Sequence, residues 1–133
     1  MSPPHHVLIV DDMADTRTLL RLLLSHKGLY AVHEAENGQQ ALEKVAQHMP
    51  DLIVLDYMMP DMSGADVCQQ LRARSETAHL PIIVLTARID YETRDQALAA
   101  GADVFMCKPL KPGELLETVR RLIAAREGIL EAD

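Results

Sequence analysis

The chain has 133 residues, of which 48% are hydrophobic and 25% are charged. This length and balance predict one globular domain with a single sizeable core, and they exclude a largely disordered chain. The formal net charge of −7 argues against a domain that binds nucleic acid through a broad basic face. The charge suits solubility, cation binding or docking to a basic partner.

The cysteines and the N-terminal residues indicate the cellular compartment. Cys68 and Cys107 have neither a metal-ligand spacing nor the pattern of a disulfide framework. Both lie in apolar segments, so we expect two buried free thiols in a reducing compartment. The first residues, MSPPHH, lack the basic start of a signal peptide, and no apolar run is long enough to span a membrane. We therefore expect a cytoplasmic protein that makes no membrane contact.

The chain begins with one strand and one amphipathic helix. Residues 6–10 (HVLIV) form a short apolar run, which predicts a buried strand. Residues 14–27 repeat leucine at helical spacing, and Gly28 is a natural stop for that helix. The apolar stripe expected on this helix consists of Leu19, Leu20, Leu23 and Leu24.

The middle of the chain continues the alternation of strand and helix. Residues 30–35 alternate in polarity like a strand with one more exposed face, and Asn37 is a good N-cap for a helix to about residue 49. Residues 52–55 (LIVL) are branched, apolar and too few for a helix, so they predict a third strand. Ser63, with Asp66 three residues later, makes a capping-box pattern at the start of the next helix.

Two further strand–helix pairs complete the pattern. Pro81 opens a fourth strand (IIVL), and Asp90 caps an alanine-rich helix that ends at Gly101. Residues 104–107 predict a fifth strand. Pro112 lies at the first turn of a last amphipathic helix.

Five strand–helix units in a row predict the α/β class: a doubly wound parallel sheet with helices on both faces. The runs VLIV, LIVL and IIVL are continuously apolar, as strands buried on both sides should be. No linker or repeat divides the chain. We expect one domain over residues 1–133, with its core at about 6–126 and a short acidic tail at 127–133.

Polar side chains stand where four of the five strands end. Asp11 and Asp12 follow the first strand, Asp56 the third, Thr86 ends the fourth, and Lys108 follows the fifth. Each has an ordinary explanation taken singly: Asp12 as a helix N-cap, Thr86 as the cap of a turn, and Lys108 as a solvated surface residue. Together they are expected to meet, because the carboxyl ends of parallel strands share one edge of the sheet.

Such a cluster of carboxylates predicts a metal. Two unit charges about 4 Å apart repel by roughly 4 kcal/mol at an effective dielectric constant near 20. A marginally stable domain needs compensation for that repulsion, and one lysine offsets only part of it. Oxygen ligands that are few in number, with waters completing the shell, favour Mg²⁺ over Zn²⁺ or Ca²⁺.

Four segments together resemble a known family. They are VLIVDDM, DLIVLDYMMPDMSG, PIIVLTA and GADVFMCKPL, in this order and at these separations. With them the chain resembles a receiver domain of the two-component response regulators over about residues 6–126. The resemblance implies the flavodoxin-like (βα)5 fold with strand order 2-1-3-4-5. It also implies a phosphoacceptor signalling switch rather than an enzyme.

The resemblance also implies roles for the residues at the strand ends. Asp56 corresponds to the aspartate that takes a phosphoryl group from a phosphohistidine on a sensor histidine kinase or a histidine phosphotransfer protein. Asp11, Asp12, Asp56 and the backbone carbonyl of Met58 correspond to the ligands of Mg²⁺. Thr86 corresponds to the hydroxyl residue that hydrogen-bonds a phosphoryl oxygen.

The fifth strand carries the remaining residues that the resemblance implies. Lys108 corresponds to the lysine that pairs with another phosphoryl oxygen, and Pro109 to a proline that usually follows a cis peptide bond. Phe105 corresponds to the aromatic switch residue that moves behind Thr86. A downstream protein is expected on the face formed by the fourth helix, fifth strand and fifth helix, roughly residues 90–124. Homodimerisation on activation is left open.

Other functions fit the residues less well. A haloacid-dehalogenase-type phosphatase also forms an aspartyl phosphate, but it requires a second aspartate where this chain has Met58. The acidic turn DDMAD disfavours a flavodoxin-like cofactor binder, and the missing glycine-rich turn excludes a dinucleotide fold. A degenerate receiver is disfavoured because every active-site position is filled.

Two questions are left to hypothesis. Met58 and Arg88 each lie two residues beyond a site residue, and we hypothesise that they help set the lifetime of the aspartyl phosphate. From the short acidic segment after residue 126 we expect no output domain. We favour a stand-alone receiver over one cut from a longer regulator with an enzymatic or DNA-binding output domain.

Overall fold

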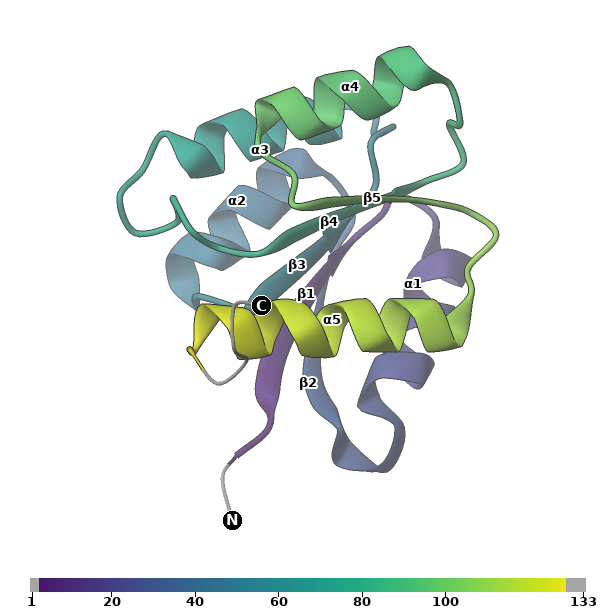
Figure 1. The fold of residues 1–133 in the computed structure, drawn as a ribbon, viewed down its shortest axis with the longest axis vertical. Coiled ribbons are helices and arrows are strands. Elements are labelled where there is room, and N and C mark those ends of the chain that lie inside the picture. The colour runs from purple at the N-terminus through teal and green to yellow at the C-terminus, as the bar shows by residue number, and fades with distance from the viewer. Residues whose placement is uncertain (1–2, 129–133) are drawn as a thin grey trace.

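Five parallel strands form one sheet in the order β2-β1-β3-β4-β5, as the computed structural model shows (Figure 1). This confirms the predicted fold class and strand order. The structure describes residues 3–128, so the acidic tail predicted at 127–133 lies outside the described residues from position 129 onward. The strands are β1 (His5–Val10), β2 (Tyr30–Ala35), β3 (Leu52–Leu55), β4 (Ile82–Thr86) and β5 (Val104–Cys107). The helices are α1 (Ala14–Ser25), α2 (Gly38–Gln47), α3 (Gly64–Arg72), α4 (Tyr91–Ala100) and α5 (Pro112–Arg126).

The helices divide between the two faces of the sheet (Figure 1). One face packs against α1 and α5, and the other packs against α2, α3 and α4. Strands β1, β3 and β4 lie inside the sheet and carry apolar side chains toward both faces, which explains their uninterrupted apolar runs. Among residues 3–128, no helix is long and apolar enough to cross a bilayer.

Three of the predicted helix caps are present. The side chain of Asn37 accepts a hydrogen bond from the backbone N–H of Gln40, and Asp90 does the same for Thr93. Ser63 and Asp66 form a complete capping box at the start of α3. These caps satisfy N–H groups that have no partner within the helix, so the loops enter α2, α3 and α4 at defined angles.

Helix α1 differs from the prediction in two respects. It ends at Ser25, and a short 3₁₀ turn (His26–Gly28) follows it. Lys27 and Gly28 have positive φ angles of 54° and 72°, which an α-helix cannot contain. Leu19, predicted to lie in the buried stripe, is 53% exposed. Leu20 and Leu24, which lie four residues apart on one face of the helix, are the residues of that stripe that are fully buried.

The two cysteines differ in exposure, which corrects one prediction. Cys68 on α3 is buried as predicted, and burial raises the pKa of its thiol to about 11. Cys107 is exposed instead of buried. It is the last residue of β5, and an edge strand lacks a neighbour on its outer side. An apolar sequence context alone does not reveal which strand lies at the edge.

Gly64 provides a test of the packing beneath the β3–α3 loop. A Cβ atom at this position would lie 2.7 Å from the backbone oxygen of Asp56, a clash that no side-chain rotation relieves. We expect Gly64→Ala to lower the free energy of unfolding by about 1–3 kcal/mol. Gly113→Ala is the control, since nothing lies within 4 Å of its Cβ position. We expect it to be neutral or stabilising by up to about 1 kcal/mol. Equal urea midpoints for the two variants would contradict the packing argument.

Candidate functional site

Three carboxylates meet at the carboxyl edge of the sheet. Asp11 and Asp12 follow β1, Asp56 follows β3, and these two strands are paired with Val10 opposite Leu55. One oxygen from each aspartate lies within 4.8 Å of the other two. Asp11 and Asp56 are only 2% and 7% exposed, whereas Asp12 is exposed. The cluster therefore has two buried acids and one side that is open to solvent.

Lys108 places a positive charge between the two buried acids. Its Nζ donates to Oδ2 of Asp11 at 2.7 Å and to Oδ2 of Asp56 at 3.2 Å. Burial alone would lower the pKa of Lys108, but the hydrogen bond to Asp11 and the charge of Asp56 outweigh it and raise the pKa above its usual value. Lys108 is thus held in the ammonium form. The peptide bond between Lys108 and Pro109 is cis.

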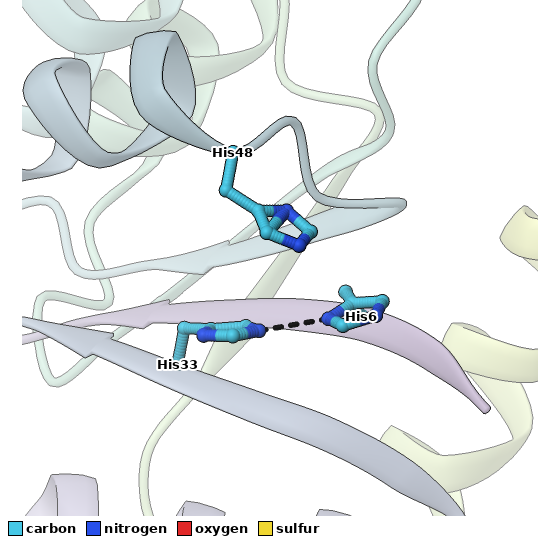
Figure 2. Close-up of side chains that lie close together, drawn as sticks. All are labelled: His6, His33 and His48. Atoms are coloured by element: carbon cyan, nitrogen blue, oxygen red, sulfur yellow. Dashed lines mark hydrogen bonds between the residues drawn. The ribbon is translucent and has the colours of Figure 1, made fainter. Parts of the chain in front are cut away.

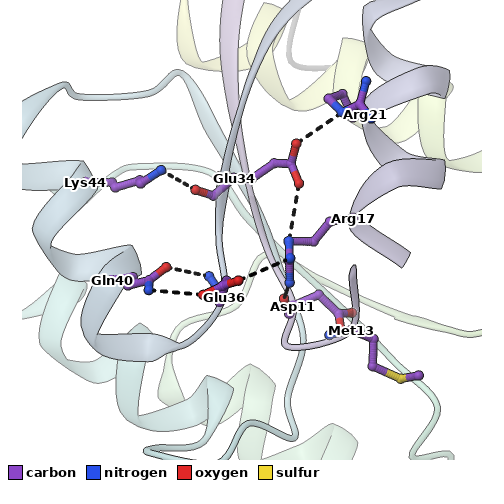
Figure 3. A network of polar contacts seen from close by, with 8 residues as sticks. All are labelled: Asp11, Met13, Arg17, Arg21, Glu34, Glu36, Gln40 and Lys44. Atoms are coloured by element: carbon purple, nitrogen blue, oxygen red, sulfur yellow. Dashed lines mark hydrogen bonds and ion pairs between the residues drawn. The ribbon is translucent and has the colours of Figure 1, made fainter. Parts of the chain in front are cut away.

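The loop after β1 is fixed by a polar network that the sequence did not reveal (Figure 3). Arg17 of α1 donates to the backbone oxygen of Asp11 at 2.7 Å and contacts the carboxylates of Glu34 and Glu36 at 3.3 and 3.5 Å. Oδ1 of Asp11 accepts the backbone N–H of Met13 at 2.9 Å. Asp11 is therefore oriented from both its backbone and its side chain.

The start of α1 also settles one alternative for Asp12. Met13 occupies the N-cap position of α1, without a side-chain cap. Asp12 does not cap the helix, and its exposed carboxylate points to a different role. The signal available in the sequence for this network was a basic residue in the first turn of the predicted helix, Arg17, five residues after the acidic pair.

The loop after Asp56 brings Met58 and Arg88 together. The backbone N–H of Met58 donates to Oδ1 of Asp56 at 3.2 Å, so both oxygens of Asp56 accept a hydrogen bond. Nη1 of Arg88 lies 3.5 Å from the sulfur of Met58, while its Nε pairs with Asp90 at 2.9 Å. Met58 is 51% exposed. The side chains of Met58 and Arg88 thus lie in contact, two residues after Asp56 and Thr86 respectively.

Thr86 and Phe105 lie on the same face of the sheet. Phe105 is opposite Val84, whose side chain shares a face with that of Thr86 two residues later. Thr86 is 1% exposed, and its Oγ1 accepts the backbone N–H of Arg88 at 3.3 Å, as the turn-cap explanation predicted. Phe105 is half-buried and packs against the core on the α2–α4 face. Part of Phe105 therefore remains exposed to solvent.

The charge balance of this site gives a stability prediction. Lys108→Met leaves Asp11 and Asp56 without their buried cation, so we expect the free energy of unfolding to fall by about 2–4 kcal/mol. Lys111→Met is the matched control, because Lys111 is exposed and its loss should change stability by no more than about 0.5 kcal/mol. Denaturant titration at neutral pH compares the two. If Lys108→Met were as stable as Lys111→Met, the ammonium would not be compensating the acids.

Comparison with known proteins places the chain in a family. A model of the response regulator receiver domain matches residues 7–120. The response regulator MprA of Mycolicibacterium vanbaalenii is 44% identical over 120 residues, covering 90% of this chain and 51% of that protein. The transcriptional regulatory protein ResD of Bacillus subtilis is 43% identical over 117 residues, covering 88% of this chain and 47% of that protein. The chain spans about half the length of these curated relatives.

Solved structures agree with this assignment. The chemotaxis response regulator CheY4 of Vibrio cholerae matches with a TM-score of 0.82 and 33% identity, covering 90% of this chain and 98% of that one. A signal receiver domain of a histidine kinase from Syntrophus aciditrophicus matches with a TM-score of 0.86 and 31% identity, covering 97% and 96%. The chain belongs to the receiver domain family of two-component response regulators.

Proposed function

We propose that Asp56 accepts a phosphoryl group from a phosphohistidine on a sensor histidine kinase or a histidine phosphotransfer protein. The observation that carries this proposal is the position of Asp56, almost buried at the sheet edge between the ammonium of Lys108 and the acids Asp11 and Asp12. A carboxylate held there can act as a nucleophile only when positive charge balances the incoming phosphate.

The reaction would exchange one phosphorus bond for another. An oxygen of Asp56 bonds to phosphorus while the bond from phosphorus to the imidazole nitrogen breaks, and the electron pair stays on that nitrogen. The transition state is loose and spreads charge over the equatorial oxygens, so positioning and neutralisation supply most of the rate. Lys108 already donates to Asp56, and the Thr86 hydroxyl ends the adjacent strand β4. Each can donate a hydrogen bond to a phosphoryl oxygen.

The donor set beside Asp56 fits Mg²⁺. Asp11, Asp12 and Asp56 offer only carboxylate oxygens, which hard cations prefer, and the exposed Asp12 leaves an entry from solvent. We propose these three side chains, with the backbone carbonyl of Met58, as the residues that would hold the ion. Bound there, Mg²⁺ would neutralise charge that builds up on the phosphoryl oxygens.

Phosphorylation would switch a surface through Thr86 and Phe105. A phosphoryl group adds negative charge and strong acceptor oxygens, which favour a conformation with the Thr86 hydroxyl turned toward them. Phe105 shares the face of Thr86 and is half-buried, so its inward movement would gain apolar burial without breaking a hydrogen bond. We propose that α4, β5 and α5 present the resulting change to a downstream protein. Exposed Tyr91 and Lys111 lie in that region.

The phosphoacceptor assignment is tested with a small phosphodonor. Incubation with acetyl phosphate and Mg²⁺, followed by intact-mass measurement, should show one phosphoryl adduct on the wild type and none on Asp56→Asn. Asp95→Asn is the control, because Asp95 is an exposed aspartate of α4 and its loss should leave the adduct in place. A wild type without adduct would overturn the proposal, and an adduct retained by Asp56→Asn would place the acceptor elsewhere.

The contact between Met58 and Arg88 gives a prediction about phosphoryl lifetime. The two side chains contact each other, and we propose that they shield Asp56, so shortening them should admit water to the acyl phosphate. We expect Met58→Ala and Arg88→Ala each to raise the dephosphorylation rate by at least about threefold, or roughly 0.65 kcal/mol in the barrier. Arg94→Ala, exposed on α4, serves as the control. Decay of the phosphorylated protein after donor removal measures the rate, and rates equal to wild type would count against this role.

A further inference from the structure

Three histidines gather at a place in the fold that the phosphoacceptor site does not use. His6 lies near the start of β1, His33 within β2, and His48 at the C-cap of α2 (Figure 2). One ring nitrogen from each lies within 4.8 Å of the other two. The sequence separates these residues by 27 and 15 positions, so no local motif reveals the cluster.

The register of the sheet explains why the rings meet. His33 is opposite Leu8 on the neighbouring strand, and Leu8 shares a face with His6 two residues before it. That face is the one covered by α2, which ends directly over it at His48. Because the aspartates follow the carboxyl end of β1, the histidines lie toward the opposite end of the same strand.

Backbone hydrogen bonds hold the cluster in place. The N–H of His6 donates to Oδ2 of Asp51 at 2.7 Å, and the N–H of Asp51 donates to the backbone oxygen of His6 at 2.7 Å. Asp51 lies only three residues after His48, the C-cap of α2. Its hydrogen bonds to His6 therefore connect the segment that follows α2 to the start of β1. These bonds keep His6 close to the end of α2, which carries His48.

The rings are arranged to offer nitrogen lone pairs. Nδ1 of His6 and Nε2 of His33 lie 2.8 Å apart and share a hydrogen bond, so one of these nitrogens carries a proton and the other accepts it (Figure 2). An ion bound by both nitrogens would replace that proton, which would move to the other nitrogen of the same ring and leave two lone pairs facing the ion. Burial lowers the pKa of His33, and the nearby His6, His48 and Lys44 lower it further. The ring of His48 extends from above toward the space beside the other two (Figure 2).

The surroundings leave room for an ion and its waters. A cavity of about 180 Å³ adjoins the rings of His33 and His48. It is lined by Leu8, His33, Lys44, Gln47, His48 and Pro50. The ammonium of Lys44 is the one positive group in that lining, and it donates to the backbone oxygen of Glu34. This hydrogen bond offsets part of the Lys44 charge. The remaining positive charge weakens the binding of a cation.

We propose that His6, His33 and His48 bind a divalent first-row transition ion, Zn²⁺ in particular, with water in the remaining position. Imidazole nitrogen is a ligand type that Zn²⁺ prefers. A tetrahedral site with Zn–N bonds of about 2.0–2.1 Å needs nitrogens roughly 3.3 Å apart. The His6–His33 separation of 2.8 Å is close to that spacing, and a small opening of the pair reaches it. The bound ion would connect β1, β2 and the end of α2.

Calorimetric titration of metal-free protein with Zn²⁺ in the presence of excess Mg²⁺ tests the site. Mg²⁺ competes for the carboxylates, so the remaining signal reports on the histidines. We expect one Zn²⁺ per chain, and binding at least about tenfold weaker in His33→Gln and His48→Gln, since losing a ligand costs no less than losing its supporting partner. His79→Gln, an exposed histidine outside the cluster, should bind like wild type. The two cluster variants should still accept phosphoryl from acetyl phosphate.

A second measurement on the wild type needs no variant. Zn²⁺ should shift the imidazole nitrogen resonances of His6, His33 and His48 and leave those of His26 and His79 unmoved. It should also raise the thermal unfolding midpoint, because the ion binds the folded state. Absence of Zn²⁺ binding would overturn the proposal, as would binding that both cluster variants retain or resonance shifts confined to His26 and His79. None of these results depends on the phosphoacceptor role of Asp56.

Discussion

The ammonium of Lys108 between Asp11 and Asp56 is the interaction on which the site depends. Two nearly buried carboxylates within a few ångströms of each other would strongly destabilise a small domain if no cation accompanied them. Lys108 joins the ends of β1, β3 and β5, although β4 lies between the last two in the sheet. One side chain thus connects the charges of three separate strands. Its two hydrogen bonds keep the edge ordered while the exposed Asp12 leaves that edge accessible.

The apolar strands form the core of this fold, and the polar residues at their carboxyl ends form the candidate site. Continuous apolar runs on β1, β3 and β4 pack against helices on both faces and fix the register of these strands. Each polar residue that follows a strand therefore takes a defined position at the carboxyl edge of the sheet. Close packing of Gly64 against the backbone of Asp56 makes the β3 end rigid. Phe105, on the edge strand β5, is only half-buried. A closely packed Asp56 beside a partly exposed edge strand is consistent with the proposed switch, in which charge at Asp56 changes the surface around β5.

Much of this structure could be predicted from the sequence, because local patterns set it. The strands, the caps at Asn37, Ser63 and Asp90, and the meeting of the acidic residues all follow from periodicity and from the geometry of parallel strands. What escaped prediction depends on contacts between distant segments. Leu19 and Cys107 are both exposed, and the neighbouring residues in the sequence encode neither fact. The histidine cluster and the contacts of Arg17 likewise require the pairing of β1 with β2 and the position of helices that pattern analysis does not place.

The different surroundings of the two cysteines make the chain suitable for selective labelling. Cys68 is buried and its raised pKa disfavours the thiolate, which is the reactive form. Cys107 is exposed and adjoins Lys108 in the chain. A thiol-reactive fluorophore would therefore attach at one position, at the end of β5 and beside the charged edge. The wild-type sequence thus already carries an attachment point from which rearrangements around the acidic cluster could be followed optically.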